Sequence, residues 1–267
     1  MFRIGLCQID GSADKEANLK LASEFVKRAA DGGARVVSLP EMWNCPYSAR
    51  YFRTFAEPAD GHTVEFMSRL AEELGIYLIG GSIPEIEDGK VYNTSFSFDP
   101  KGGMIGRFRK VHLFDVDIEG GIRFKESDTL TPGDEMLVLD TGFGKIGVAI
   151  CFDVRFPEWF RKMTLAGARL VVLPAAFNMT TGPAHWDLLM RARALDNQIY
   201  VAANARAGDS DGPYHSFGNS CIASPWGDFI AHTDEKTGII YGDIDPDYVD
   251  KIREELPLLK CRRQELY

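Results

Sequence analysis

The sequence predicts an α/β protein with buried strands covered by helices, organised as one domain that contains two sheets. Short runs rich in Val, Ile and Leu alternate along the whole chain with segments of amphipathic pattern. No linker rich in Ser, Gly and Pro separates the two halves. A chain of 267 residues, 45% of them hydrophobic, is long enough to bury a large core.

Strands and helices are expected in regular alternation. Apolar runs bounded by Gly, Pro, Asn or Asp predict strands, and the amphipathic segments between them predict helices. In the first half we expect strands at 3–8, 35–38 and 77–80, helices at 17–30 and 64–74, and a hairpin of 92–98 with 101–109. In the second half we expect a hairpin of 137–140 with 145–150, helices at 158–166 and 186–197, and strands at 170–174, 200–204, 220–224 and 239–243.

Turn residues predict the two hairpins. Pro100-Lys101-Gly102-Gly103 joins the first pair of strands, and Thr141-Gly142-Phe143-Gly144 joins the second. The letters from Gly142 to Gly147 also match the dinucleotide-binding pattern, but that pattern requires a helix after the glycines. Because a strand follows here, we interpret the segment as a hairpin turn.

Residues 246–267 are predicted to form an irregular tail outside a domain made of residues 1–245. The tail carries the apolar run Leu256-Pro257-Leu258-Leu259, followed by Arg262 and Arg263. An apolar run of this kind is expected to pack against a surface. We expect that surface to belong to the domain itself or to a neighbouring subunit.

Charge and composition narrow the range of partners. The formal net charge is −9, with 39 Asp and Glu against 30 Lys and Arg. Nucleic acids and anionic membranes bind concentrated Lys and Arg, so we expect neither as a partner and favour small molecules or proteins. No apolar stretch reaches the length that spans a bilayer, and the first residues lack the pattern of a secretory signal. We therefore expect a cytoplasmic location.

The five cysteines are odd in number and scattered, with no Cys-x-x-Cys pair. This pattern indicates neither a disulfide framework nor a zinc site. Asn93-Thr94-Ser95 and Asn178-Met179-Thr180 match the N-glycosylation pattern. Without a secretory route, we interpret both as chance matches.

Cys151 is the candidate nucleophile. It ends the apolar run 146–150 and is followed at once by the polar, turn-forming stretch 152–158. A thiol at the point where a buried strand opens into a loop is well placed for chemistry. The alternative is a buried cysteine that only packs in the core, since free cysteine behaves as a small hydrophobic residue.

Two ionisable residues follow strands in the same way. Glu41 comes directly after the apolar run 36–40, and Lys110 follows the strand that ends at Arg109. Ligand sites collect at the carboxyl ends of strands in α/β sheets, so Glu41, Lys110 and Cys151 are expected to converge. The alternatives are a helix-capping or surface acid for Glu41 and a solvated charge for Lys110.

Together, these three groups could catalyse acyl transfer. A desolvated Glu41 is basic enough to take the thiol proton, and the thiolate then attacks a carbonyl or nitrile carbon. Lys110 and the backbone N–H of Phe152 would stabilise the oxyanion. Glu126 is a fourth candidate catalytic residue, because a buried acid there would orient Lys110 or the attacking water.

Three segments resemble the signature motifs of the nitrilase superfamily of carbon–nitrogen hydrolases. They are Leu39-Pro40-Glu41, 109–114 and 151–158, in the family's order and with compatible spacing. The resemblance covers nearly the whole chain. It implies a four-layer αββα sandwich, a catalytic triad of Glu41, Lys110 and Cys151, a thioester intermediate, and neither metal nor cofactor.

Within the superfamily the sequence is most similar to the omega-amidase branch. That branch hydrolyses the terminal amide of 2-oxoglutaramate or 2-oxosuccinamate to a 2-oxo diacid and ammonia. The resemblance rests on the segments 114–117, 124–127, 176–186 and 191–198. One departure is Gly120-Gly121, where members of the branch have Pro-Gly. This difference leaves the triad untouched and bears on fine substrate preference.

The resemblance also suggests residues that bind the substrate. Arg155 is the candidate for the distal carboxylate, because its planar guanidinium suits bidentate binding. The alternative for Arg155 is a structural ion pair with Asp153 or Glu158. By resemblance, the residues expected to line the pocket are Phe177, Asn178, Thr181 and Trp186. For Trp186 in particular, core packing is the alternative.

Two other functions remain open at this stage. The first is another hydrolase of the superfamily, such as a deaminated-glutathione amidase, an N-carbamoyl hydrolase or an aliphatic amidase. The second is a binding or scaffold protein with a silent site, against which the presence of all three triad residue types argues. The resemblance further implies a homodimer or a higher homo-oligomer, in which the C-terminal tail reaches the partner.

Overall fold

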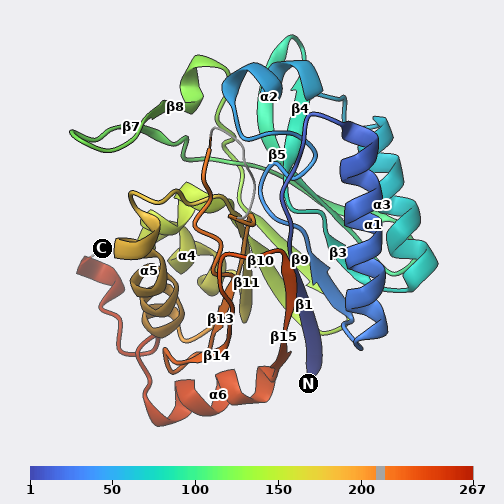
Figure 1. Ribbon diagram of the computed structural model, residues 1–267. Helices are drawn as coiled ribbons and strands as arrows, with labels where there is room; N and C mark the ends of the chain where they lie inside the picture. The colour runs from blue at the N-terminus through green and yellow to red at the C-terminus, as the bar shows by residue number, and fades with distance from the viewer. Residues whose placement is uncertain (209–213, 267) are drawn as a thin grey trace.

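The computed structural model describes residues 1–208 and 214–266. Two sheets pack face to face, with α1 and α3 covering one outer face and α4 and α5 covering the other (Figure 1). This is the expected four-layer αββα sandwich. The core between the sheets is continuous, and each outer layer of helices seals a second apolar layer.

The first sheet has seven strands in the order β15-β1-β2-β3-β5-β4, with β6 paired to β5. Strands β1, β2 and β3 run parallel, and the others pair antiparallel to their neighbours. Their bounds are β1 Phe2–Gln8, β2 Val36–Ser38, β3 Tyr77–Ile79, β4 Ile83–Glu87, β5 Lys90–Phe98, β6 Met104–Arg109 and β15 Gly238–Ile244.

The second sheet has six strands in the order β14-β13-β12-β11-β10-β9, with β10, β11 and β12 parallel. Their bounds are β9 Leu137–Thr141, β10 Gly144–Val148, β11 Leu170–Ala175, β12 Tyr200–Ala205, β13 Cys221–Ala223 and β14 Phe229–His232. The segment from Gly142 to Gly147 forms the turn and start of the β9–β10 hairpin, which confirms its interpretation as a hairpin turn.

The helices are α1 Lys15–Asp31, α2 Ala49–Phe55, α3 His62–Leu74, α4 Pro157–Leu165, α5 Gly182–Asn197 and α6 Pro246–Glu255. Capping residues and glycine or proline explain where several of these helices begin and end. The Asp14 side chain accepts a hydrogen bond from the N–H of Ala17 and caps α1, and Pro157 begins α4, where its missing N–H costs nothing. Gly75 ends α3 in the left-handed conformation that glycine adopts without a steric penalty.

The alternating side chains of strand β1 pack into two apolar layers, one on each side of the sheet. Phe2, Ile4 and Leu6 point into the core between the sheets, whereas Gly5 and Cys7 face the helices. A Cβ added at Gly5 would lie only 3.1 Å from the Cβ of Ala29 in α1. The glycine therefore allows the helix to approach the sheet closely.

Every strand and helix expected from the sequence is present, with ends shifted by a few residues. The prediction of an irregular tail was wrong for its first part, because Pro246–Glu255 forms α6. Asp245 caps this helix, and Val249 and Ile252 bury its apolar side against the domain. The short elements α2, β4 and β14 were not predicted.

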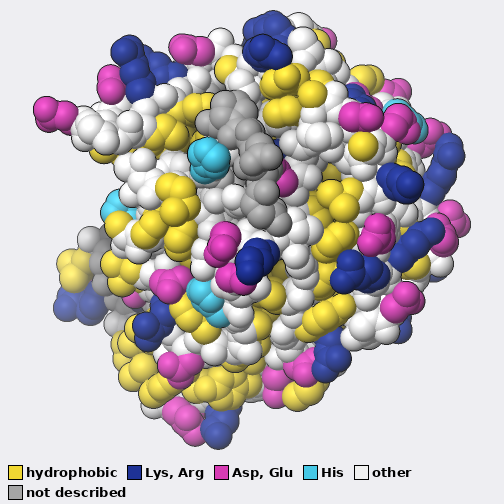
Figure 2. Space-filling view, in the orientation of Figure 1, with side chains coloured by type: hydrophobic (Ala, Val, Ile, Leu, Met, Phe, Trp, Pro, Cys, Tyr) yellow, Lys and Arg dark blue, Asp and Glu magenta, His cyan; other side chains and the backbone are white. Residues whose placement is uncertain are grey.

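The surface carries no concentration of one charge on the face shown in Figure 2. Acidic and basic side chains are interspersed there, with apolar groups between them. In the described part of the chain, no helix is both long and apolar enough to cross a membrane.

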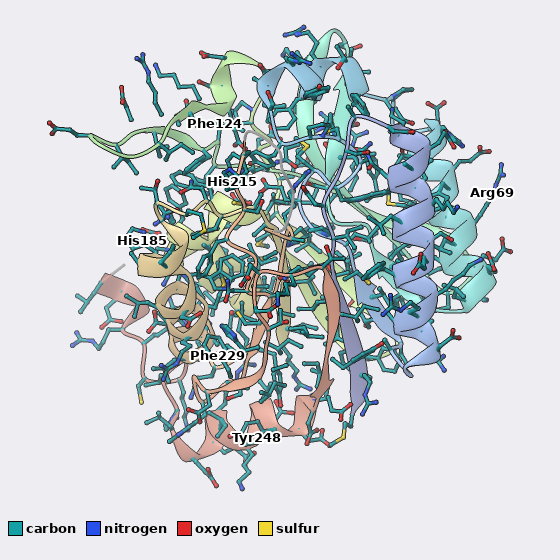
Figure 3. The ribbon with its side chains drawn as sticks, viewed as in Figure 1. Arg69, Phe124, His185, His215, Phe229 and Tyr248 are labelled. Carbon is teal, nitrogen blue, oxygen red and sulfur yellow. The ribbon has the colours of Figure 1, made fainter. Side chains whose placement is uncertain are left out.

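A two-stranded hairpin projects from the sandwich beside the ends of the sheets (Figure 1). It consists of β7 Asp115–Asp117 and β8 Arg123–Lys125, and it was not predicted. The ring of Phe124, labelled in Figure 3, lies 5.8 Å from the ring of Tyr47 and 6.2 Å from that of Phe114. The hairpin leads directly into a 3-10 turn, Glu126–Asp128, which brings Glu126 into the interior.

Candidate active site

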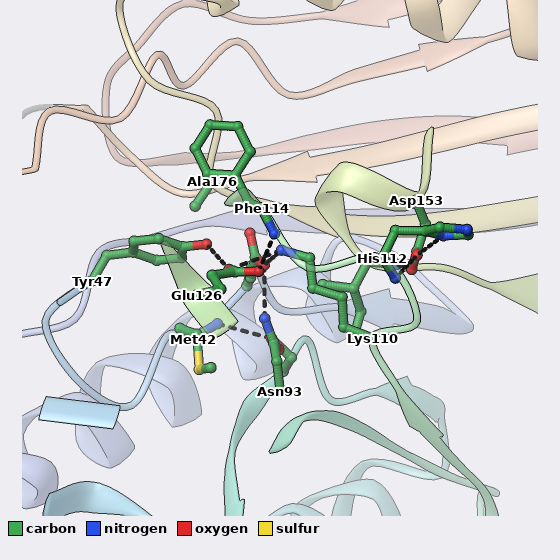
Figure 4. Close-up of polar contacts among 12 residues, drawn as sticks. Met42, Tyr47, Asn93, Lys110, His112, Phe114, Glu126, Asp153 and Ala176 are labelled. Atoms are coloured by element: carbon green, nitrogen blue, oxygen red, sulfur yellow. Dashed lines mark hydrogen bonds and ion pairs between the residues drawn. The ribbon is translucent and has the colours of Figure 1, made fainter. Parts of the chain in front are cut away.

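Lys110 occupies the centre of a fully buried charge cluster. It directly follows β6, and its Nζ lies 2.9 Å from Oε1 of Glu41 and 2.9 Å from Oε1 of Glu126 (Figure 4). All three side chains have no exposed surface. The cluster therefore contains two carboxylates and one ammonium that are shielded from bulk solvent.

Glu126 has partners for both oxygens. Oε1 accepts hydrogen bonds from Lys110 and from the hydroxyl of Tyr47 at 2.8 Å, and Oε2 accepts one from the backbone N–H of Phe114 at 2.7 Å. A buried carboxylate is tolerated only when such donors replace water. Glu126 is therefore held rigidly and in turn holds Lys110.

Glu41 lies on a tightly held loop that follows β2. Its neighbour Met42 has a φ of 51°, and the hydroxyl of Ser82 binds the N–H of Met42 at 3.0 Å. The buried guanidinium of Arg206 donates to the carbonyl of Met42 and to that of Gly11 at 3.0 Å, and it pairs with Asp10. Because Arg206 follows β12 of the second sheet, it ties that sheet to the loop that carries Glu41.

Cys151 begins a 3-10 turn, Cys151–Arg155, and is 5% exposed. Its φ is 45°, a strained value for a residue other than glycine, and such strain is concentrated at functional sites. The buried carboxylate of Asp153 holds the turn: it accepts from the N–H of Ile150 at 2.9 Å and lies 2.7 Å from Nδ1 of His112. The strained conformation is thus fixed by its surroundings.

The charges of the cluster shift the pKa of the Cys151 thiol. Burial raises the pKa of Cys151 well above its usual value, and the negative charge of Glu41 raises it further. The positive charge of Lys110 and a hydrogen bond from the N–H of Ala176 lower it. The resting thiol is therefore protonated, and it needs a base in order to become a nucleophile.

Glu41 has the properties of that base. Burial raises its pKa above the usual 4.5, which Lys110 opposes and Glu126 reinforces. For Lys110, burial alone would lower the pKa, but the two carboxylates raise it well above 10.5, so the amine stays charged. The arrangement thus offers a strengthened base and a permanent cation near one thiol, which suits nucleophilic attack on a carbonyl carbon.

Cys151 opens into a pocket of about 200 Å³. The residues that line it are Phe114, Cys151, Phe152, Arg155, Ala176, Phe177, Asn178 and Thr181. The pocket is small, and the polar side chains Arg155, Asn178 and Thr181 stand among its apolar and aromatic walls. The side-chain Oδ1 of Asn178 accepts from the N–H groups of Thr180 at 2.8 Å and Thr181 at 3.0 Å, which fixes one wall.

Among the described residues that line this pocket, Arg155 is the one with a positive charge. Its guanidinium lies over the rings of Phe152 and Phe177, 5.6 and 5.2 Å from their centres, and Nη1 is 3.3 Å from Nδ1 of His185. Within the described ranges it forms no ion pair with a carboxylate, so the alternative of a pair with Asp153 or Glu158 is not realised. A charge without a counterion in a pocket favours an anionic ligand.

The structure brings together most of the residues singled out in the sequence, but not Trp186. Its ring is completely buried behind Phe177, with ring centres 5.0 Å apart, and its Nε1 donates to the carbonyl of Asn219 at 2.7 Å. The expectation that Trp186 lines the pocket was therefore wrong. Its position on α5 turns the indole into the core.

Sequence patterns missed several residues that shape the site: Tyr47, Asn93, Asp153 and Arg206. Tyr47 and Arg206 lie in segments without a motif. Asp153 appeared only in the Cys151 segment and as an alternative partner of Arg155, and Asn93 appeared only as a chance glycosylation match. Their importance comes from contacts between segments far apart in the chain, such as the 2.8 Å bond from Tyr47 to Glu126. No local signal in the sequence carries that information.

Fold and site together define a carbon–nitrogen hydrolase. The chain belongs to the carbon–nitrogen hydrolase family, whose model matches residues 3–254. Among similar proteins is the omega-amidase NIT2 of Xenopus tropicalis, with 49% identity over 266 residues, which cover 100% of this chain and 96% of the relative.

Solved structures support the same assignment. Nit3 of Saccharomyces cerevisiae, a member of branch 10 of the nitrilase superfamily, matches with a TM-score of 0.91 and 40% identity over 98% of this chain and 96% of that one. A mutant of the amidase from Nesterenkonia sp. AN1 matches with a TM-score of 0.79 and 25% identity over 99% and 95% of the two chains. In that structure the acetamide moiety of fluoroacetamide is added covalently at the active-site cysteine.

The charge cluster predicts a pH-dependent loss of stability in Lys110→Met. Without the ammonium, the pKa of Glu41 in the folded protein rises further above its usual 4.5. The folded state then binds more protons than the unfolded state, so stability falls as the pH rises above that value. We expect the free energy of unfolding in urea to drop by about 3–5 kcal/mol at about pH 8 and by less at about pH 5.5.

Lys20→Met on the exposed face of α1 is the control, and it should change little at either pH. An equal loss at both pH values in Lys110→Met would contradict the electrostatic origin of the effect.

Proposed function

We propose that this protein is an omega-amidase, which hydrolyses the terminal amide of 2-oxoglutaramate or 2-oxosuccinamate to a 2-oxo diacid and ammonia. The observation that carries this proposal is the placement of Cys151 between the buried cluster of Glu41, Lys110 and Glu126 and a small pocket that contains the cation of Arg155. The omega-amidase name of the similar Xenopus protein supports the same substrate class.

The first half of the reaction forms a thioester. Glu41 takes the proton of the Cys151 thiol as the sulfur attacks the amide carbon. The negative charge that develops on the carbonyl oxygen is stabilised by Nζ of Lys110 and the backbone N–H of Phe152. Glu41 then passes its proton to the amide nitrogen, the carbon–nitrogen bond breaks and ammonia leaves.

The second half releases the acid. A water molecule enters where ammonia left, and Glu41 takes one of its protons as the oxygen attacks the thioester carbon. The same two donors stabilise the second oxyanion. When the carbon–sulfur bond breaks, the proton on Glu41 returns to the sulfur, which restores the thiol. Glu126 keeps Lys110 in place throughout through their 2.9 Å contact.

The pocket favours a short substrate with an anionic end. The net charge of −9 repels dicarboxylates in general, so a local cation is needed to bind one. Arg155 supplies it, and we assign it to the carboxylate at the end of the substrate away from the amide. Phe177, Asn178 and Thr181 are assigned to the walls that contact the carbon chain.

We further propose a cytoplasmic homodimer that binds neither nucleic acid nor membrane. The five cysteines are free thiols, as expected of a protein in a reducing compartment. The acidic net charge disfavours binding to nucleic acid. The C-terminal segment exposes Leu258 and Leu266, which we assign to contact with the partner subunit. Light scattering at micromolar concentration should give twice the mass of the chain, and the mass of one chain would contradict the dimer.

The nucleophile is tested with Cys151→Ala. Release of ammonia from 2-oxoglutaramate should fall by more than about 10⁴-fold, because no other group can form the thioester. The matched control is Cys261→Ala, which removes an exposed thiol and should retain normal turnover. Normal turnover in Cys151→Ala would refute the mechanism.

Arg155→Met tests the substrate class. Loss of the guanidinium should lower kcat/KM for 2-oxoglutaramate by about 10–100-fold, mostly through KM, because a hydrogen-bonded charge pair is lost. Turnover of a neutral amide of similar length should stay unchanged. Arg191→Met, which alters an exposed arginine on α5, is the control. If the unmodified protein prefers a neutral amide or a carbamoyl compound, another activity of the family replaces the proposed one.

A further inference from the structure

Asn93 lies at the centre of the site, although the sequence pattern suggested only a chance glycosylation motif. It belongs to β5, and Asn93, Thr94 and Ser95 are all completely buried. A buried strand offers no access to a modifying enzyme. The asparagine contacts two members of the charge cluster instead.

One contact uses the main chain and the other the side chain. The carbonyl oxygen of Asn93 accepts a hydrogen bond from the backbone N–H of Lys110 at 2.8 Å. The Nδ2 group of Asn93 donates to Oε1 of Glu41 at 2.8 Å (Figure 4). Asn93 therefore fixes both the strand end that presents Lys110 and the carboxylate of Glu41.

Because of the hydrogen bond from the Asn93 side chain, the two carboxylate oxygens of Glu41 have different partners. Oε1 accepts from Nδ2 of Asn93 and also from Nζ of Lys110 at 2.9 Å. Oε2 is equally buried and accepts from no nitrogen or oxygen donor within the described ranges. The Cys151 thiol is a hydrogen-bonding neighbour of the Glu41 carboxylate. Two donors on one oxygen hold the plane of the carboxylate and leave the other oxygen with its lone pairs available.

We propose that Asn93 is a positioning residue that anchors Glu41 through Oε1 and thereby dedicates Oε2 to proton exchange with Cys151. The proposal rests on the proposed function only in taking Glu41 as the base for the thiol. A base that had to release another donor before each proton transfer would pay a reorganisation cost in every cycle. With Asn93 in place, that cost is avoided.

A purely structural role does not account for this residue. Oδ1 of Asn93 is buried without a hydrogen-bond partner among the described residues, which costs desolvation free energy. Leucine has the same number of side-chain heavy atoms and the same branching at Cγ, and it carries no unpaired oxygen. The amide is therefore expected to serve the carboxylate that it contacts rather than the stability of the fold.

The test measures the reactivity of Cys151 in Asn93→Leu and Asn93→Ala, which both retain the main-chain bond to Lys110. The rate of alkylation by iodoacetamide is followed against pH by peptide mass spectrometry, with exposed Cys261 as the internal reference. An N–H donor favours the charged carboxylate, so its loss raises the pKa of Glu41. Compared with the unmodified protein, we expect alkylation of Cys151 to be about tenfold slower near neutral pH. The midpoint of the curve of alkylation rate against pH should lie about one pH unit higher.

Asn197→Leu is the matched control. Asn197 is also buried, its Nδ2 makes one hydrogen bond, to the carbonyl of Arg193 at 2.9 Å, and its Oδ1 has no partner in the described part of the chain. It lies at the end of α5, away from the cluster, so this variant should leave the rate and the midpoint for Cys151 unchanged. Alkylation needs no amide substrate, so the result decides the role of Asn93 even if the omega-amidase proposal fails.

Steady-state kinetics add a second readout. A positioning role lowers kcat for 2-oxoglutaramate and leaves KM nearly unchanged. Folded Asn93 variants that keep the original rate and pH midpoint would overturn the proposal. So would the same change in Asn197→Leu, or a failure of both Asn93 variants to fold in circular dichroism, since the role would then be structural.

Discussion

The burial of one ammonium between two carboxylates is the constraint on which the site depends. Removing three charges from water carries a large desolvation cost, which only close pairing and additional hydrogen bonds offset. Here Lys110 is 2.9 Å from both Glu41 and Glu126, and Tyr47 adds a further donor. The cluster keeps one negative charge in excess, so Glu41 is a stronger base than an exposed glutamate, and the protonated Cys151 thiol is its natural partner.

The sandwich supplies the rigidity that such a cluster requires. Glu41, Lys110 and Cys151 follow β2, β6 and β10, strands that belong to two different sheets. Arg206, which follows β12, donates to the backbone carbonyls of Glu41 and Met42, and Asp153 holds the turn of Cys151. The packing of the two sheets therefore determines the geometry of the site. A substitution between the sheets would disturb the chemistry without contacting the substrate.

The sequence predicted the parts of this account that leave a local pattern. Alternating apolar runs identified the strands, and the positions after them identified Glu41, Lys110 and Cys151 as candidates. Tyr47 and Arg206 leave no pattern, and Asn93 leaves only a glycosylation match unrelated to its contacts, because their roles depend on segments that meet only in the folded chain. Trp186 was placed in the pocket because it lies in a recognised segment, yet helical geometry turns it into the core. Helix α6 was missed because only two of its residues, Val249 and Ile252, are buried.

The most direct test of the account is to trap the covalent intermediate. By this account Glu41 is needed both to form and to hydrolyse the thioester. The unmodified protein is therefore mixed with 2-oxoglutaramate and quenched in acid within one turnover, and Glu41→Gln is the variant that should form no adduct. Mass spectrometry should then show the mass of the substrate less ammonia added to the peptide that contains Cys151. An adduct on another residue, or product formed at the normal rate with no adduct at any time, would contradict the account.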